Sequence, residues 1–140
     1  MSRENVELVR RTAELFASKG IDASLEYTAE DVIAYPFPEW IGQSEYRGHE
    51  GMRALLAEWA DNFDDIRFEP EEFFDAGDRV VTTFRMSGRI KGSGAPLSQS
   101  IAAVSGRIEH GKVGEVHYFL TLEQAFECAG LEQVAREQTP

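Results

Sequence analysis

The sequence predicts one α+β domain with a mainly antiparallel sheet, and two observations carry that prediction. Apolar residues recur at helical spacing in the N-terminal part of the chain, and strand-like alternation replaces this pattern after Asp65. Helices followed by hairpin-connected strands favour α+β over repeated strand–helix–strand units. The 140 residues suit one domain, and because no repeat or linker interrupts them we place a single domain over 1–140.

Helical spacing defines the expected helices. The first helix, over 3–19, rests on an apolar stripe formed by Val6, Val9, Ala13 and Phe16. The second, over 50–61, rests on a stripe at i, i+3, i+4 and i+7 formed by Met52, Leu55, Leu56 and Trp59. Between them, Asp22 resembles an N-cap and predicts a short helix over 23–28.

Strands and one short helix account for the rest of the chain. A first strand over 32–35 stops at two prolines, and an apolar loop follows. Runs rich in β-branched and aromatic residues predict the other strands, within 66–75, 79–90, 97–107 and 113–119. His110-Gly111 is a hairpin signal, and Gly130 would cap a terminal helix. The polar tail after Glu132 is expected to fray.

Composition excludes several classes of partner. The net charge of −11 repels phosphate backbones and anionic headgroups, so neither nucleic acid nor a membrane surface is an expected partner. No apolar run approaches the roughly 20 residues of a membrane helix. Cys128, the only cysteine, rules out an internal disulfide, and without a signal peptide the chain is expected in the cytoplasm. We expect Cys128 to be a small packing residue.

Three stretches in this order resemble the SnoaL-like branch of the nuclear transport factor 2-like superfamily, which includes the ketosteroid isomerases. They are DVIAYPFPEWIGQSEYRGHEGMRALLAEW, DAGDRVVTTFRMSGRIKGSG and HGKVGEVHYFLTLEQAFECAGL. The resemblance covers nearly the whole chain. It implies a cone-shaped barrel, in which a curved sheet wrapped by N-terminal helices surrounds an apolar pocket, and a homodimer formed through the outer face of the sheet. Because the superfamily supports many chemistries, the function has to be argued from the site.

The chain departs from the superfamily where its enzymes carry an acid. SnoaL-like cyclases usually have an Asp nine positions before the glycine that ends the terminal helix, and that position here is Thr121. Tyr118 stands where an epoxide hydrolase would have an inward acid. A carboxyl group in an apolar pocket has a raised pKa and can act as a base, whereas threonine and neutral tyrosine cannot replace it.

His117 is the obvious substitute base, because its ordinary pKa lies near neutrality. Alternation along the strand, however, puts His117 on the opposite face from Tyr118. If Tyr118 lines the pocket, His117 faces outward, as a structural or dimer-interface residue. Metal and cofactor sites are not expected, since the three histidines fall in separate elements and no CxxC or HxxxH spacing occurs.

Five residues are expected to form the ligand pocket: Tyr35, Trp40, Trp59, Arg85 and Tyr118. For each aromatic residue, core packing is the alternative, and for Trp59 it is the stronger reading. Arg85 can bind a ligand oxygen only if its face of the strand is the inner one, and Phe84 competes for that face. The loop from Pro36 to Tyr46 is expected to close the mouth with Phe37, Trp40 and Ile41.

Three functions remain open. The first is an enzyme acting on a small apolar molecule, as an isomerase, cyclase, dehydratase or hydrolase. The second is a binding module for a small hydrophobic molecule, which needs only the pocket. The third is a structural dimer with an incidental pocket. An ionisable group inside the cone would favour the enzyme, and a cone filled by side chains would favour the structural dimer.

Overall fold

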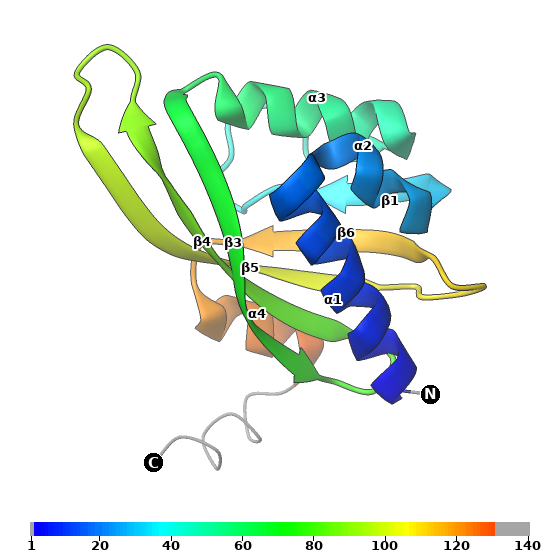
Figure 1. Cartoon of the computed structure of the whole chain (residues 1–140). Helices are drawn as coiled ribbons and strands as arrows, with labels where there is room; N and C mark the ends of the chain where they lie inside the picture. The colour runs from blue at the N-terminus through cyan, green and yellow to red at the C-terminus, as the bar shows by residue number, and fades with distance from the viewer. Residues whose placement is uncertain (1, 131–140) are drawn as a thin grey trace, which may run out of the picture.

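A curved six-stranded sheet organises the residues that the computed structural model describes, 2–130 (Figure 1). Its strand order is β2-β1-β6-β5-β4-β3. The strands are β1 (Thr28–Tyr35), β2 (Tyr46–Arg47), β3 (Phe63–Asp75), β4 (Val80–Ile90), β5 (Pro96–Gly106) and β6 (Val113–Phe119). Only β1 and β6 pair in parallel among these neighbours, and every other pair is antiparallel. The predicted α+β class and mainly antiparallel sheet are confirmed.

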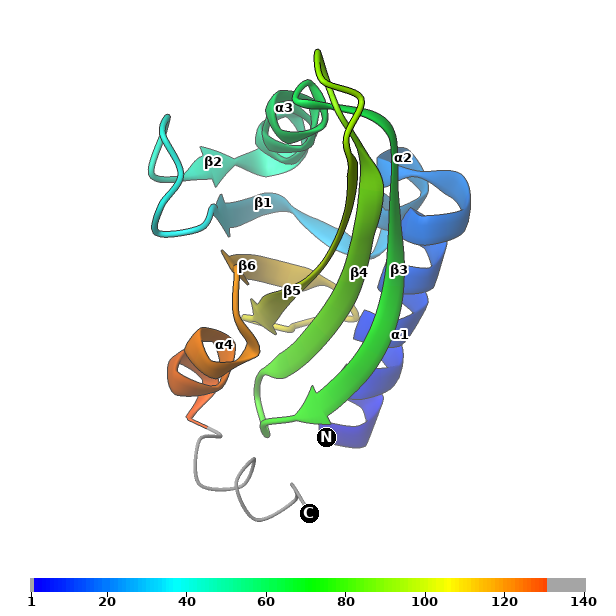
Figure 2. The same ribbon diagram turned by 90° about the vertical axis from the view of Figure 1, so that its left-hand side faces the viewer.

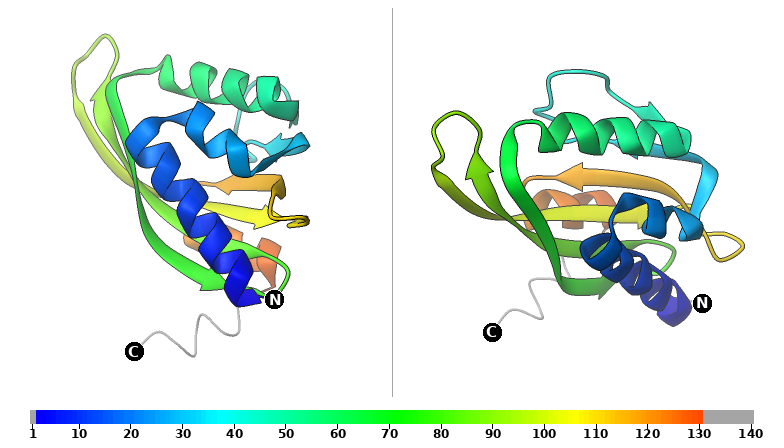
Figure 3. Two further views of the ribbon diagram at one scale, coloured as in Figure 1. Left: turned by 45° about the vertical axis from the view of Figure 1, so that its right-hand side comes forward. Right: turned by 45° about the horizontal axis from the view of Figure 1, so that its top comes forward.

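The curvature of the sheet creates the space in which a site can form. β3 and β4 are long, bent strands that sweep around one side of the molecule (Figure 2). Register shifts between Asp64 and Arg67 and between Pro70 and Glu72 bend β3 along its length. The sheet does not close, and helices cover its concave side (Figure 3). This arrangement is the cone expected from the resemblance.

Three helical segments cover the concave face. They are α1 (Ser2–Lys19), α2 (Ile21–Ser24) with the 3-10 turn Leu25–Tyr27, and α3 (Gly48–Ala60). α1 packs along β3, and α3 packs along β1. Gly51 permits the close approach of α3 to β2, because a Cβ at Gly51 would lie only 2.7 Å from the backbone carbonyl carbon of Tyr46. None of the helices described within 2–130 combines the length and hydropathy needed to cross a bilayer.

The terminal helix α4 (Leu122–Ala129) packs on the convex face of the sheet (Figure 2). Its Ala125 and Phe126 cover Val81, Ala102 and Val104, all of which are fully or almost fully buried. The middle strands are therefore apolar on both faces near α4, which explains the continuous apolar character of β4 and β5 at this point.

Several local expectations were correct and others were wrong. The His110-Gly111 hairpin is confirmed, since both residues have positive φ angles and Glu109 and Lys112 exchange backbone hydrogen bonds. Asp22 is not an N-cap, because α2 already begins at Ile21, and its carboxylate instead accepts a hydrogen bond from Arg53 at 2.8 Å. β1 starts at Thr28, four residues before the predicted strand. The tail after Glu132 lies outside the described residues.

Candidate functional site

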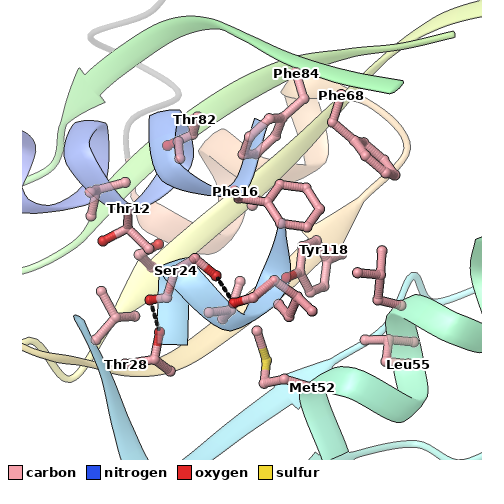
Figure 4. Close-up of a pocket in the computed structure, with 18 of the residues that line it drawn as sticks. Thr12, Phe16, Ser24, Thr28, Met52, Leu55, Phe68, Thr82, Phe84 and Tyr118 are labelled. Carbon is pink, nitrogen blue, oxygen red and sulfur yellow. Dashed lines mark hydrogen bonds between the residues drawn. The ribbon is translucent and has the colours of Figure 1, made fainter. Parts of the chain in front are cut away.

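A cavity lies between the concave face of the sheet and the helices α1, α2 and α3 (Figure 4). The volume open to the centre of a water molecule is about 110 Å³. One water needs roughly 10–15 Å³ by this measure, so the cavity has room for a small organic molecule. The wall is formed by Val9, Thr12, Ala13, Phe16, Ile21, Ser24, Thr28, Met52, Leu55, Leu56, Trp59, Phe68, Thr82, Phe84, Ile101, Ala103, Ser105, Val113, Val116 and Tyr118.

Aromatic rings form one end of this cavity. Trp59 makes edge-to-face contacts with Phe68 and Tyr118, with ring centroids 5.5 and 6.2 Å apart, and Phe16 lies 5.2 Å from Phe68. Behind Trp59, Phe37 packs edge-on at 4.7 Å. Contacts of this geometry hold large rings in fixed positions, so the wall is preorganised for flat apolar surfaces.

Tyr118 is the only residue of this wall with an ionisable side chain. It comes from β6, opposite Ala103 of β5, and its ring faces the cavity (Figure 4). Desolvation raises the pKa of its hydroxyl to about 12. No group within residues 2–130 forms a hydrogen bond that offsets this effect. The hydroxyl is therefore protonated at neutral pH and free to donate to a molecule in the cavity.

The other polar groups of the wall are the indole N–H of Trp59 and five short hydroxyls, those of Thr12, Ser24, Thr28, Thr82 and Ser105. Three of them donate to backbone carbonyls of their own segment: Thr12 to Leu8, Ser24 to Ile21 and Thr28 to Ser24, at 2.7–3.1 Å. Thr82 differs, because its buried Oγ1 has no hydrogen-bond partner among the described residues. No Asp, Glu, His, Lys, Arg or Cys belongs to the wall, so it offers no acid–base group that titrates near neutrality.

Two of the five predicted pocket residues, Trp59 and Tyr118, line the cavity, and the other three do not. Trp40 packs beside Phe37 and donates its indole N–H to the Tyr46 hydroxyl at 3.1 Å. Within the loop expected to close the mouth, Phe37 is buried but Ile41 is 97% exposed. Phe37 of this loop packs against Trp59, and no residue of the loop belongs to the cavity wall, so closure of the mouth by the loop stays a prediction.

Tyr35 lies on the convex face, so its predicted place in the pocket was wrong. β1 and β6 pair in parallel with Tyr35 beside His117, and the two rings stack with centroids 4.3 Å apart. His117 therefore faces away from the cavity, as alternation predicted once Tyr118 faced inward. The Nε2 of His117 lies 3.4 Å from Oε1 of Glu115, which also approaches Arg79.

Arg85 also lies on the convex face, because Phe84 occupies the inner position on β4. Its side chain is 43% exposed and its Nε lies 3.5 Å from a carboxylate oxygen of Glu71. Because the sheet separates this face from the cavity, Arg85 cannot reach a ligand there. The expectation that it supplies the charged group of the pocket was wrong.

Thr121 has a structural role at the start of α4. Its hydroxyl oxygen accepts the backbone N–H of Gln124 at 3.2 Å, which is N-cap geometry. It does not belong to the cavity wall. The position that carries an Asp in the cyclases the sequence resembles is thus occupied here by a helix cap on the convex side of the sheet.

Sequence reasoning missed the inner hydroxyl of Thr82 and the rings of Phe16 and Phe68 as cavity residues. Phe16 was visible as part of the α1 stripe, but a stripe shows which face is buried and not that a void lies beneath it. The inner set of β4 is Val80, Thr82, Phe84 and Met86, and it could have been found by extending the alternation from Phe84.

A family model described as a SnoaL-like domain matches residues 9–116, which is more than half of the chain. The chain belongs to the SnoaL-like family. No curated protein matches it at a significant level. The resemblance seen in the sequence is thereby confirmed.

Solved structures show the same fold at low sequence identity. TerC co-crystallised with polyporic acid is 21% identical, with a TM-score of 0.71, over 91% of this chain and 98% of TerC. A candidate SnoaL-like polyketide cyclase from Jannaschia sp. CCS1 is 22% identical, with a TM-score of 0.70, over 91% of each chain. A protein with a ketosteroid isomerase-like fold from Catenulispora acidiphila DSM 44928, in complex with trimethylamine, is 19% identical, with a TM-score of 0.66, over 96% and 98%.

Proposed function

We propose that this SnoaL-like protein binds a small, uncharged, largely apolar molecule in the cavity, with the Tyr118 hydroxyl donating a hydrogen bond to an oxygen of that molecule. One observation carries the proposal: a preorganised apolar cavity holds a single ionisable group, which is protonated and unpaired. An oxygen acceptor would replace the water that the hydroxyl loses on burial.

The chemistry of the wall favours an uncharged ligand. No charged side chain lines the cavity, so a buried carboxylate or ammonium group would have no counterion. Burying an unpaired charge is far more costly than burying a carbonyl or hydroxyl that finds a hydrogen bond. Apolar and aromatic surface would supply most of the affinity, and Tyr118 would set the orientation of the ligand.

The same wall favours binding over catalysis by proton transfer. An isomerase, cyclase or dehydratase that moves a proton needs a base near its substrate, and among the wall residues only Tyr118 ionises. With a pKa of about 12, Tyr118 is a hydrogen-bond donor and not a base at neutral pH. The neighbouring structures support the proposal only in showing that this fold occurs with small organic molecules, such as polyporic acid in TerC.

The fused-ring ketone 1-tetralone is a suitable probe, because it has one carbonyl and otherwise apolar surface. We expect calorimetry to show saturable binding to the wild-type protein. Tyr118→Phe should weaken it by about two- to tenfold, since a net hydrogen bond is worth about 0.5–1.5 kcal/mol. Ala103→Leu should abolish binding, because Ala103 lies on the cavity floor beside Tyr118.

Tyr35→Phe is the matched control, since Tyr35 has the same chemistry on the opposite face. It should leave the affinity for 1-tetralone unchanged. The rate of deuterium exchange at the carbon beside the ketone should equal that in buffer if the protein only binds. Equal affinity in the wild type, Tyr118→Phe and Ala103→Leu would overturn the cavity as the site. Accelerated exchange would show that the protein is an enzyme after all.

A further inference from the structure

Thr82 is the one buried side-chain oxygen or nitrogen among the described residues that lacks a hydrogen-bond partner. The residue is 1% exposed, lies near the start of β4 and belongs to the cavity wall. Buried hydroxyls almost always find a partner within the protein or in an ordered molecule beside them. Thr82 borders the cavity, but its Oγ1 is enclosed by neighbouring atoms. Rotation about the Cα–Cβ bond of Thr82 would turn the hydroxyl into the cavity, where an occupant is the available source of that partner.

Strand register places Thr82 and Tyr118 in one row across the concave face. Thr82 pairs with Ala103 of β5, and Ala103 pairs with Tyr118 of β6. Neighbouring strands lie roughly 4.8 Å apart, so the two backbone positions are separated by about 10 Å before curvature. The small side chain of Ala103 between them leaves the middle of the row open. In the close-up, Thr82 faces the cavity from the sheet at a distance from Tyr118 (Figure 4).

We propose that the ligand carries a second oxygen at its far end, which hydrogen-bonds to Thr82 while the first accepts from Tyr118. This inference rests on the proposed function and narrows it. The ligand class is an elongated, uncharged molecule of about two fused rings, polar at both ends and apolar between them. The Thr82 hydroxyl both donates and accepts, so a hydroxyl or a carbonyl oxygen satisfies it.

Other hydroxyls of the wall fit this role less well. Thr12, Ser24 and Thr28 already donate to backbone carbonyls. Ser105 is more accessible, at 7% exposed against 1% for Thr82. Thr82 alone combines near-complete burial with an unpaired oxygen. The hydroxyl of its chain neighbour Thr83, which is also buried, accepts the backbone N–H of Glu72 at 3.1 Å on the other face of the strand. The two threonines therefore form a natural pair for comparison, one with an unpaired hydroxyl beside the cavity and one with a hydroxyl bonded within the sheet.

The test compares two probes that differ by one hydroxyl, 1-tetralone and 6-hydroxy-1-tetralone, whose hydroxyl lies across the ring system from the ketone. We expect the wild-type protein to bind 6-hydroxy-1-tetralone about tenfold more tightly, as for one further net hydrogen bond. Thr82→Val keeps the shape of the side chain and should erase that preference, so that the two probes bind the variant with equal affinity. Tyr118→Phe should weaken both probes and keep the preference.

The outcomes separate this inference from the proposed function. If both probes bind through Tyr118 but Thr82→Val leaves the preference unchanged, or the wild type shows none, this inference is overturned and the proposed function stands. If neither probe binds to the wild type, both fall.

Thermal unfolding without ligand gives an independent readout. Thr82→Val should not lower the melting temperature, because it removes an unpaired hydroxyl, whereas Thr83→Val should lower it by removing a bonded one. A Thr82→Val protein that melts as early as Thr83→Val would show that Thr82 already has a partner inside the protein, and would overturn the inference.

Discussion

His117 stacks on Tyr35 on the convex face of the sheet, while the next residue in the chain, Tyr118, faces the cavity. Desolvation lowers the pKa of His117 below its ordinary value of 6.5, and Arg79 acts in the same direction, against the opposing effect of Glu115. The imidazole is therefore mainly neutral in the folded protein at neutral pH. It belongs to the packing of the convex face and not to the site.

This lowered pKa predicts a pH effect on stability. The unfolded chain binds a proton at His117 at higher pH than the folded protein, so the folded state loses stability as pH falls below 6.5 toward the folded pKa. The free-energy difference between the wild type and His117→Gln should shrink on acidification through this range. Urea unfolding at pH 7.5, 6.5 and 5.5 measures it. An NMR titration midpoint for His117 above 6.5 would contradict the prediction.

A chain of two hydrogen bonds fixes the loop before α3. The indole N–H of Trp40 donates to the Tyr46 hydroxyl, which donates to Glu58 at 2.7 Å. Tyr46 is almost fully buried, and Tyr46→Phe would remove both hydrogen bonds and leave the half-buried indole N–H of Trp40 without its partner. We expect a loss of about 1–3 kcal/mol in the free energy of unfolding. Urea unfolding measures this loss.

Tyr27→Phe is the control for Tyr46→Phe, because the Tyr27 hydroxyl only accepts a long, exposed hydrogen bond from Arg11 at 3.5 Å. It should change the unfolding free energy little. Equal losses in the two variants would show that the hydrogen bonds of the buried Tyr46 hydroxyl stabilise the fold no more than the exposed hydrogen bond of Tyr27.

The fold was largely predictable because its elements leave local signals. Helical stripes mark α1 and α3, and the His110-Gly111 turn fixes the register of the hairpin that leads into β6. The start of β1 was missed, because Glu30 and Asp31 lie in a stretch where charged residues and an irregular register break the alternation. Boundaries of this kind depend on the neighbouring strand and not on the segment itself.

The site was harder to predict, because which side chains of a strand face the cavity depends on the elements that cover each face of the sheet. On β4, Phe84 and Met86 alternate with Arg85 and Ser87, which identifies the inner face. Tyr35 gives no such signal, since its place on the convex face follows only from its parallel pairing with His117. Long-range pairing is not encoded in the periodicity of a single strand, so an aromatic residue at a strand end can point either way.

The homodimer expected from the family resemblance stays a prediction that concerns the convex face. α4 covers part of this face, and Tyr35, His117 and Phe119 lie partly buried beside it. We expect sedimentation equilibrium at micromolar concentration to show a dimer. Tyr35→Glu should shift it to a monomer, because a carboxylate would be buried at the interface without a partner. The control Tyr27→Glu should remain a dimer, and a wild-type monomer would contradict the prediction.

The role of Thr121 gives the last prediction. As the N-cap of α4, its hydroxyl accepts the backbone N–H of Gln124, so Thr121→Ala should cost about 1 kcal/mol in the free energy of unfolding. Thr121→Asp should retain the wild-type stability, because aspartate is an equally good N-cap and its charge suits the start of a helix.

Thr121→Asp also tests whether an acid at this position can act on a ligand. It introduces the acid that the family resemblance leads one to expect here, but Thr121 lies outside the cavity wall, and the new carboxylate would cap α4 on the convex side. Deuterium exchange beside the ketone of 1-tetralone should therefore stay at the wild-type rate. Faster exchange in Thr121→Asp than in Thr121→Asn, which caps the helix without a base, would show that this position reaches the ligand after all.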